Sequence, residues 1–286
     1  MNTSVAQRVQ SPLNLILPVK SWLELKELSV VYTFKEREMV NARESLCNLH
    51  FARFVELHDQ NQIGYFTVYD GDFRTYFGSF IQYIGPVFDA LFKHVVDGPP
   101  VPCEKNREAF ITWSSAHDQK GIGFYSAHPT LTVKEIRARS GTELGGIQTW
   151  GEQSALTIVL PIKSPTHFEA LSQSLNQFLP DLYATLDTIG TVHFFRFVPL
   201  GTHALALVGE LDGGLAKLAE NFSTHLGPMF DEIFKNAIGT PPTPVRENGR
   251  AFTDWFIGHN LNTWGFYCAY PGLTVQNVRV LAGTWA

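Results

Sequence analysis

The sequence has few cysteines, and those it has do not pair. Cys47, Cys103 and Cys268 are an odd number. In the internal repeat described below, Cys103 is matched by Val245. Cys268 is matched by Ser126. The pattern argues against a disulfide framework and against a duplicated thiolate metal site, so we expect reduced cysteines and no metal.

Clustered positive charge and long hydrophobic runs are also missing. Lys and Arg number 22 against 27 Asp and Glu, which gives a net charge of −5 without a basic run. A nucleic-acid surface needs clustered cations, so nucleic acid is not an expected partner. The apolar runs are shorter than the roughly 20 residues of a membrane span. The first residues, MNTSVAQRVQSP, include no apolar segment of the signal-peptide kind. We therefore expect a cytoplasmic protein without a membrane partner, and the sequence leaves a homo-oligomer open.

What the sequence does contain is an internal duplication. Residues 14–138 recur, with changes, at 157–280. The clearest matches are LPVKS (17–21) with LPIKS (160–164), HFARFV (50–55) with HFFRFV (193–198), and IGPVFDALFK (84–93) with LGPMFDEIFK (226–235). The offset is 143 residues in the first two pairs and 142 in the third. Two copies of one module therefore make up most of the chain.

The duplication sets the expected domain boundaries. They are a tail (1–13), a first module (14–138), a linker (139–156) that contains the glycines of SGTELGG, and a second module (157–286). Composition and periodicity predict the elements of the first module. They are a strand (15–19), a helix (22–47), a hairpin (49–57 and 63–69), a helix (73–95), a short helix (107–117) and a strand (121–127).

A glycine and a proline fall inside the predicted helix at 73–95. Gly85-Pro86 has the counterpart Gly227-Pro228 in the second copy. Proline has no N–H to donate to the carbonyl four residues earlier, so we expect a bend or a break at both places.

Without the short helix, each module reads βαββαβ. This order is typical of the ferredoxin-like plan, an antiparallel four-stranded sheet with its helices on one face. The other face would be exposed and apolar, so we expect the two sheets to pack face to face within one chain. The duplicated plan resembles the dimeric α/β barrel superfamily in a fused form. That superfamily includes dye-decolorizing peroxidases, chlorite dismutase-like haem proteins, cofactor-free monooxygenases and EthD-like proteins.

The HF(A/F)RFV strands offer the first candidate site residues. Side chains alternate along a strand, so His50 and Arg53 point to opposite faces, as do His193 and Arg196. We expect Arg53 and Arg196 to face the interior, where a guanidinium can anchor an anionic substrate. His50 and His193 are further substrate-binding candidates. Alternatively, the arginines pair with carboxylates at the rim and the histidines cap backbone groups.

Asp70-Gly71 and Asp212-Gly213 are the second candidates. Residues 209–213 (GELDG) are similar to the GxxDG pattern that carries the distal aspartate of dye-decolorizing peroxidases. The resemblance implies a catalytic Asp212. Because both copies keep the aspartate between a strand and a helix, the alternative is an N-cap of the helix that follows.

The resemblance also implies a haem held by a histidine from a helix. His259 is the candidate ligand, His225 is a second because it occurs only in the second copy, and Arg279 is the candidate distal arginine. The pair His117 and Arg137 repeats His259 and Arg279 in the first copy, which favours a structural role instead.

Two functions follow from these residues. The first is a peroxidase-like or monooxygenase-like oxidoreductase that acts on a hydrophobic or aromatic small molecule in a barrel cavity, with haem as its cofactor or with none. Asp212 and either Arg196 or Arg279 would then handle protons and peroxide. The alternative is a non-catalytic barrel that binds a hydrophobic small molecule or serves as a scaffold, which the 22 phenylalanines also suit. Because the copies differ, we expect any site to lie in the second one.

Overall fold

The computed structural model describes residues 8–57, 61–141 and 153–283. The chain divides into two compact units. Unit 1 consists of Met1–Gln119, Pro129–Thr149 and Thr263–Pro271. Unit 2 consists of Lys120–His128, Trp150–Asn262 and Gly272–Ala286.

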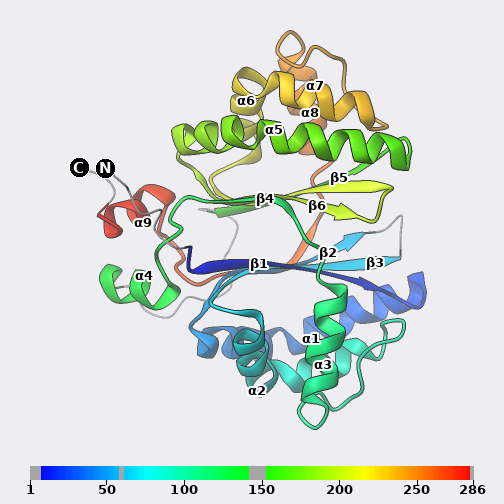
Figure 1. The fold of residues 1–286 in the computed structure, drawn as a ribbon. Coiled ribbons are helices and arrows are strands. Elements are labelled where there is room, and N and C mark those ends of the chain that lie inside the picture. The colour runs from blue at the N-terminus through cyan, green and yellow to red at the C-terminus, as the bar shows by residue number, and fades with distance from the viewer. Residues whose placement is uncertain (1–7, 58–60, 142–152, 284–286) are drawn as a thin grey trace. The chain divides into compact units, whose positions relative to one another are not determined.

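Unit 1 is an antiparallel sheet with helices on one face (Figure 1). Its strand order is β1-β3-β2-β8. The strands are β1 (Gln10–Pro18), β2 (Leu49–Leu57), β3 (Gln62–Asp70) and β8 (Thr263–Cys268). The helices are α1 (Trp22–Leu46), α2 (Phe73–Phe92), α3 (Arg107–His117) and α4 (Val133–Ser140).

Unit 2 repeats this arrangement, with the strand order β4-β6-β7-β5. The strands are β4 (Ile122–Ser126), β5 (Gln153–Pro161), β6 (Val192–Leu200) and β7 (Ala204–Asp212). The helices are α5 (Pro165–Ile189), α6 (Leu215–His225), α7 (Gly227–Asn236), α8 (Gly249–Gly258) and α9 (Val275–Leu281). The architecture is therefore mixed α and β with two antiparallel four-stranded sheets, consistent with a duplicated ferredoxin-like fold.

The fourth strand of each sheet comes from the other repeat. β8 belongs to the second repeat but pairs with β2, placing Ala52 opposite Tyr267. β4 belongs to the first repeat but pairs with β6, placing Phe195 opposite Tyr125. The compact units thus differ from the contiguous modules expected from the duplication. The physical reason is that β4 and β8 share the sequence GFY, so either strand suits either sheet edge.

Most element boundaries agree with the sequence patterns. The predicted strand at 49–57 and the helix at 107–117 are reproduced, whereas β1 begins at Gln10, inside the expected tail. β5 begins at Gln153, inside the expected linker, and most of SGTELGG lies outside the described residues. The helices α4 and α9 were not predicted. The packing of one sheet on the other stays a prediction.

The two proline sites behave differently. In unit 2 the helix breaks between α6 and α7, and Pro228 opens α7. In unit 1, α2 continues through Pro86, so the expected break is absent there. The reason concerns the backbone carbonyl four residues before each proline, because proline has no N–H to donate to it. In unit 2 that carbonyl belongs to Thr224 and accepts from Arg246 Nε at 3.0 Å. Glu104, which stands at the position of Arg246 in unit 1, has no donor to offer.

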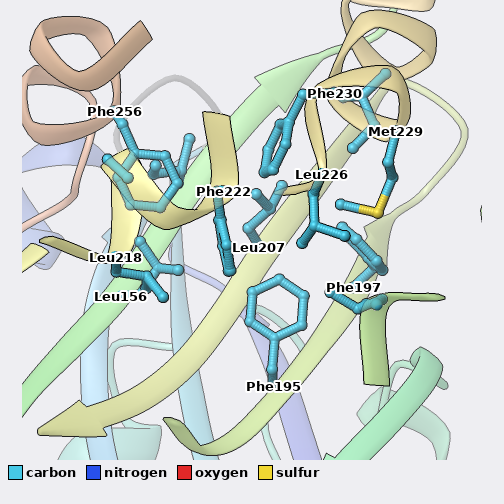
Figure 2. Packing of buried hydrophobic residues seen from close by; sticks show 14 of the residues in the cluster. Leu156, Phe195, Phe197, Leu207, Leu218, Phe222, Leu226, Met229, Phe230 and Phe256 are labelled. Carbon is cyan, nitrogen blue, oxygen red and sulfur yellow. The ribbon is translucent and has the colours of Figure 1, made fainter. Parts of the chain in front are cut away.

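The core of unit 2 lies between its sheet and its helices and consists mainly of leucine and phenylalanine side chains. Figure 2 shows Leu207 of β7 and Leu218 of α6 among phenylalanine rings, including Phe222 and Phe230. Side chains of this kind pack closely and carry no polar atoms that need a partner. Of the helices within the described residues, none is both long enough and apolar enough to cross a membrane.

Candidate functional site

His50 and Asp70 form a buried pair in unit 1. His50 begins β2, Asp70 ends β3, and the distance between His50 Nε2 and Asp70 Oδ1 is 2.8 Å. The other carboxylate oxygen accepts from the Val133 N–H, at the first residue of α4, at 2.8 Å. His50 Nδ1 lies 3.0 Å from the Tyr270 hydroxyl. When His50 donates from Nε2 to the carboxylate, its Nδ1 is left to accept from Tyr270.

His193 and Asp212 repeat this pair in unit 2. His193 Nε2 lies 2.9 Å from Asp212 Oδ1, and Asp212 Oδ2 accepts from the Val275 N–H of α9 at 2.7 Å. His128 takes the place of Tyr270, with its Nε2 3.4 Å from His193 Nδ1. Both units therefore keep a His–Asp pair tied to the start of a short helix.

This geometry revises the helix-cap interpretation of the aspartates. Asp70 and Asp212 accept from the first N–H of α4 and of α9, which lie far along the chain and have their own N-caps in Thr132 and Thr274. The helix directly after Asp70 is capped by Asp72, which accepts from the Thr75 N–H at 2.9 Å. Since both units share the arrangement, it holds the fold in each and does not distinguish a catalytic Asp212.

Arg53 and Arg196 are buried, on the sheet face opposite the helices. Phe54, the neighbour of Arg53 on β2, packs on the helix side against Phe88 of α2, and alternation sends Arg53 the other way. The Arg53 guanidinium lies over the Phe66 ring at 5.7 Å. Arg196 Nη1 lies 3.5 Å from Glu210, and both side chains are inaccessible to solvent. A role for either arginine in binding a substrate stays a prediction.

Arg279 and its counterpart Arg137 hold the exchanged segments. Arg279 Nε donates to the Ala127 carbonyl at 3.2 Å, and its Nη2 pairs with Asp187 at 2.6 Å. Arg137 Nε donates to the Ala269 carbonyl at 2.7 Å. Each arginine thus connects the last helix of one repeat to the exchanged strand of the other. These bonds anchor Arg279 in the framework, and a distal role for it stays a prediction.

Within the described residues, no contact brings the candidate haem ligands together. His259 Nδ1 donates to the Trp255 carbonyl at 2.8 Å and its ring stacks on Trp255, and His117 makes the same bond to Trp113. His225 is exposed beside a surface hollow of about 370 Å³. A haem held by His259 or His225 stays a prediction.

Among the described residues, one group of side chains could hold a metal. His94 Nδ1 is hydrogen bonded to Glu24 and lies 3.8 Å from Glu27, and the three ligand atoms fall within 4.8 Å of one another. The group is partly exposed, and exposed acidic side chains commonly gather without an ion, so it carries no metal proposal.

Unit 1 contains a buried polar cluster that the sequence patterns did not identify. It consists of Tyr32 and Arg43 on α1, Tyr65 on β3 and Tyr76 on α2, between the helices and the sheet. Arg43, Tyr65 and Tyr76 have no exposed surface, and Tyr32 is 4% exposed. We call these four residues the Arg–Tyr cluster.

The cluster is poorly supplied with hydrogen-bond partners. Arg43 Nη1 donates to the Gly265 carbonyl of β8 at 2.8 Å. Among the described residues, Arg43 Nε, Arg43 Nη2 and the hydroxyls of Tyr32, Tyr65 and Tyr76 have no partner in good hydrogen-bond geometry, although these groups neighbour one another. Arg43 also lies over the face of Tyr267 at 5.9 Å, and no ion pair with a carboxylate is seen for it in the part of the chain that the structure describes. A guanidinium cannot discharge itself, so a buried cation with one neutral acceptor is costly to the fold.

Electrostatics ties the cluster together. Burial opposes the charge of Arg43, but the neighbouring Tyr32 and Tyr65 keep its pKa above the ordinary value. Burial raises the pKa of Tyr65, and it raises that of Tyr76 further. Tyr65 and Tyr76 therefore remain protonated near neutral pH, so their hydroxyls can act as donors.

The backbone makes room for the cluster at Gly265. This glycine has a positive φ of 55°, and a Cβ at the same position would overlap the Tyr32 hydroxyl. Aromatic rings surround the cluster. The ring centroid of Phe54 lies 4.7 Å from that of Tyr65, and the ring centroid of Trp264 lies 6.2 Å from that of Tyr32.

The repeat itself supplies the signal that could have identified the cluster. Aligned on the duplication, its members Tyr32, Arg43, Tyr65 and Tyr76 are matched by Leu175, Leu186, Leu207 and Leu218. All four leucines are buried in unit 2. A comparison restricted to catalytic residue types overlooks tyrosines that replace core leucines.

Comparison with known proteins gives only remote likenesses. No family model matches the chain, and no curated protein matches it either. Among solved structures it is similar to a proposed monooxygenase of Fusobacterium nucleatum, with 11% identity over 93% of this chain and 97% of that one and a TM-score of 0.43. A proposed monooxygenase of Lactobacillus acidophilus has 8% identity over 80% and 90% of the two chains, with a TM-score of 0.36. An anthrone oxidase-like protein has 8% identity over 94% and 96%, with a TM-score of 0.30.

Proposed function

We propose that this protein is an oxidoreductase that binds a small oxygenated aromatic molecule inside unit 1, at the Arg–Tyr cluster. The observation that carries the proposal is the contrast between the units. Four buried leucines of unit 2 are matched in unit 1 by an arginine and three tyrosines. Within the described residues, five of their polar atoms lack a partner in good hydrogen-bond geometry, a cost that leucine side chains do not carry. A ligand that supplies oxygen atoms would remove that cost.

The cluster suits an aromatic ligand for two reasons. Its walls are rings, among them Phe54, Phe80 and Phe88 around Tyr65, and these can stack on or pack edge-on against a bound ring. Its polar atoms can meet a ligand oxygen from several sides. The proposal places the site in unit 1 and not in the second copy, where the sequence differences first suggested it.

An oxidising role follows from the charge of Arg43. A phenol or an enol gives up electrons to dioxygen more readily once it has lost its proton, and a buried cation favours the deprotonated form. The arginine and tyrosines would hold the oxygen of the substrate while the surrounding rings exclude water. In that reaction the substrate is oxidised and dioxygen is reduced.

Oxygen uptake with anthrone, an aromatic ketone that ionises to an enolate, tests the proposal. We expect the wild-type protein to consume oxygen in its presence and Arg43→Met to lose most of this activity. Leu186→Met, which changes the matching residue of unit 2, should behave as wild type. Uptake that survives in Arg43→Met would place the chemistry elsewhere. Binding without uptake would favour the alternative, a protein that binds a small aromatic molecule without transforming it.

A further inference from the structure

The Arg–Tyr cluster is rich in hydrogen-bond donors. Arg43 has only N–H groups, and Tyr65 and Tyr76 keep their hydroxyl protons because burial raises their pKa values. Arg43 Nη1 donates to the Gly265 carbonyl. The tyrosine hydroxyls can also accept, but an ionised oxygen makes a stronger hydrogen bond to a guanidinium than a neutral hydroxyl does.

The charge of Arg43 also favours a negatively charged ligand. Arg43 is fully buried and pairs with no carboxylate of the described residues, so among them its positive charge is not compensated. In unit 2 the matching residue Leu186 carries none. A ligand with a single negative charge neutralises the interior of unit 1, and its oxygen can take Arg43 Nε and Nη2 side by side.

We infer that the cluster is an anion site, which binds a phenol, enol or carboxylic acid in its deprotonated form. This inference rests on the function proposed above and adds to it the charge state of the ligand. On binding, the O–H bond of the ligand breaks, the electron pair stays on its oxygen and the proton leaves to the solvent. A cation within a few ångströms lowers the pKa of the bound acid by about 1 to 3 pH units.

4-Nitrophenol is a direct probe, because only its phenolate form is yellow. The titration is made in a buffer acidic enough that the free probe is almost wholly the colourless phenol. We expect wild-type protein to bring up the phenolate absorption band in proportion to the bound fraction. Arg43→Met should abolish the band. Tyr65→Phe, which keeps the ring but removes one donor, should weaken it. Leu186→Met should leave it unchanged.

4-Nitroanisole, the methyl ether of the probe, separates this inference from the proposed function. The ether cannot ionise, so wild-type protein should bind it at least tenfold more weakly than 4-nitrophenol. If both probes bind equally and no phenolate band appears, the site is neutral and the anion inference is wrong while the aromatic site stands. If neither probe binds, solvent satisfies the cluster, and both proposals are wrong. A phenolate band that persists in Arg43→Met would also overturn the inference.

Discussion

At the residue scale, one helix position is charged in the first repeat and apolar in the second. Arg43 and Leu186 occupy the same turn of matching helices and are equally buried. The leucine adds apolar surface to a closed core. The arginine brings a charge that the fold around it does not neutralise, a feature that selection for stability alone would remove. The cost is therefore best explained by something that arginine does.

Arg43→Met should stabilise the ligand-free protein. Replacing buried charge by an apolar side chain of similar length is often favourable, by about 1 to 4 kcal/mol. The matched change Leu186→Met should cost less than about 1.5 kcal/mol, because it conserves volume in an apolar core. Urea unfolding followed by circular dichroism measures both. A large loss of stability in Arg43→Met would mean that the fold itself satisfies the guanidinium.

At the element scale, two short helices are fixed by distant aspartates. The carboxylate of Asp70 accepts from the first N–H of α4, and that of Asp212 accepts from the first N–H of α9. Each carboxylate also holds a buried histidine. The short helices α4 and α9 thus depend on residues about 60 positions earlier in the chain, the separation being 63 in both. Local patterns do not reveal these contacts, but the helices themselves have a local signal, the capping boxes that begin at Thr132 and Thr274, from which they could have been predicted.

Asp70→Ala and Asp212→Ala should destabilise the protein by similar amounts. Each change removes an acceptor from the first N–H of a helix that keeps its own N-cap, and it leaves a buried histidine without this carboxylate, which costs about 1 to 3 kcal/mol; loss of the Asp72 cap costs about 1 kcal/mol. Asp72→Ala, which removes only the exposed cap of α2, is the control and should cost the cap alone. Denaturant unfolding gives the three values. A much smaller loss for Asp70 or Asp212 than for Asp72 would show that the His–Asp pairs contribute nothing.

The two prolines should respond to substitution with opposite signs. Pro86 lies inside the continuous helix α2, so Pro86→Ala restores a backbone donor and should stabilise unit 1, by up to about 3 kcal/mol. Pro228 opens α7, a place where proline fits, and Arg246 already satisfies the Thr224 carbonyl. Pro228→Ala should therefore be neutral or destabilising. Thermal unfolding of the two variants tests this prediction. Equal shifts of the unfolding midpoint in both variants would contradict it.

At the scale of the whole molecule, the duplication predicted the elements but not their partners. The hairpin of β2 and β3 was predictable from apolar runs on either side of a polar turn. The exchange of β4 and β8 was not, because both strands carry GFY and the sequence does not say which sheet each joins. The Arg–Tyr cluster was not predicted from the sequence for a related reason. Its residues are spread over α1, β3 and α2, and the glycine that accommodates them lies on the exchanged strand β8.

The exchange has a consequence for the separate repeats. Residues 1–141 alone keep β1, β2 and β3 but lose β8, so the edge of β2 that pairs with Cys268 and Tyr267 is exposed. The fragment still carries its own β4, whose GFY sequence suits that edge. We expect two copies of the fragment to exchange β4 strands and form a homodimer whose unfolding midpoint rises with protein concentration.

Analytical ultracentrifugation and urea unfolding at several fragment concentrations test this expectation. Replacing Gly123 and Phe124 of β4 by proline should prevent the dimer, because proline cannot donate to the ladder, and should leave the fragment largely unfolded. The same replacement in the full-length chain should act on unit 2, where β4 resides, and leave the sheet of unit 1 folded. A folded, monomeric fragment with a midpoint independent of concentration would show that each repeat can complete its own sheet. The exchange would then be a property of the fused chain and not a requirement of the fold.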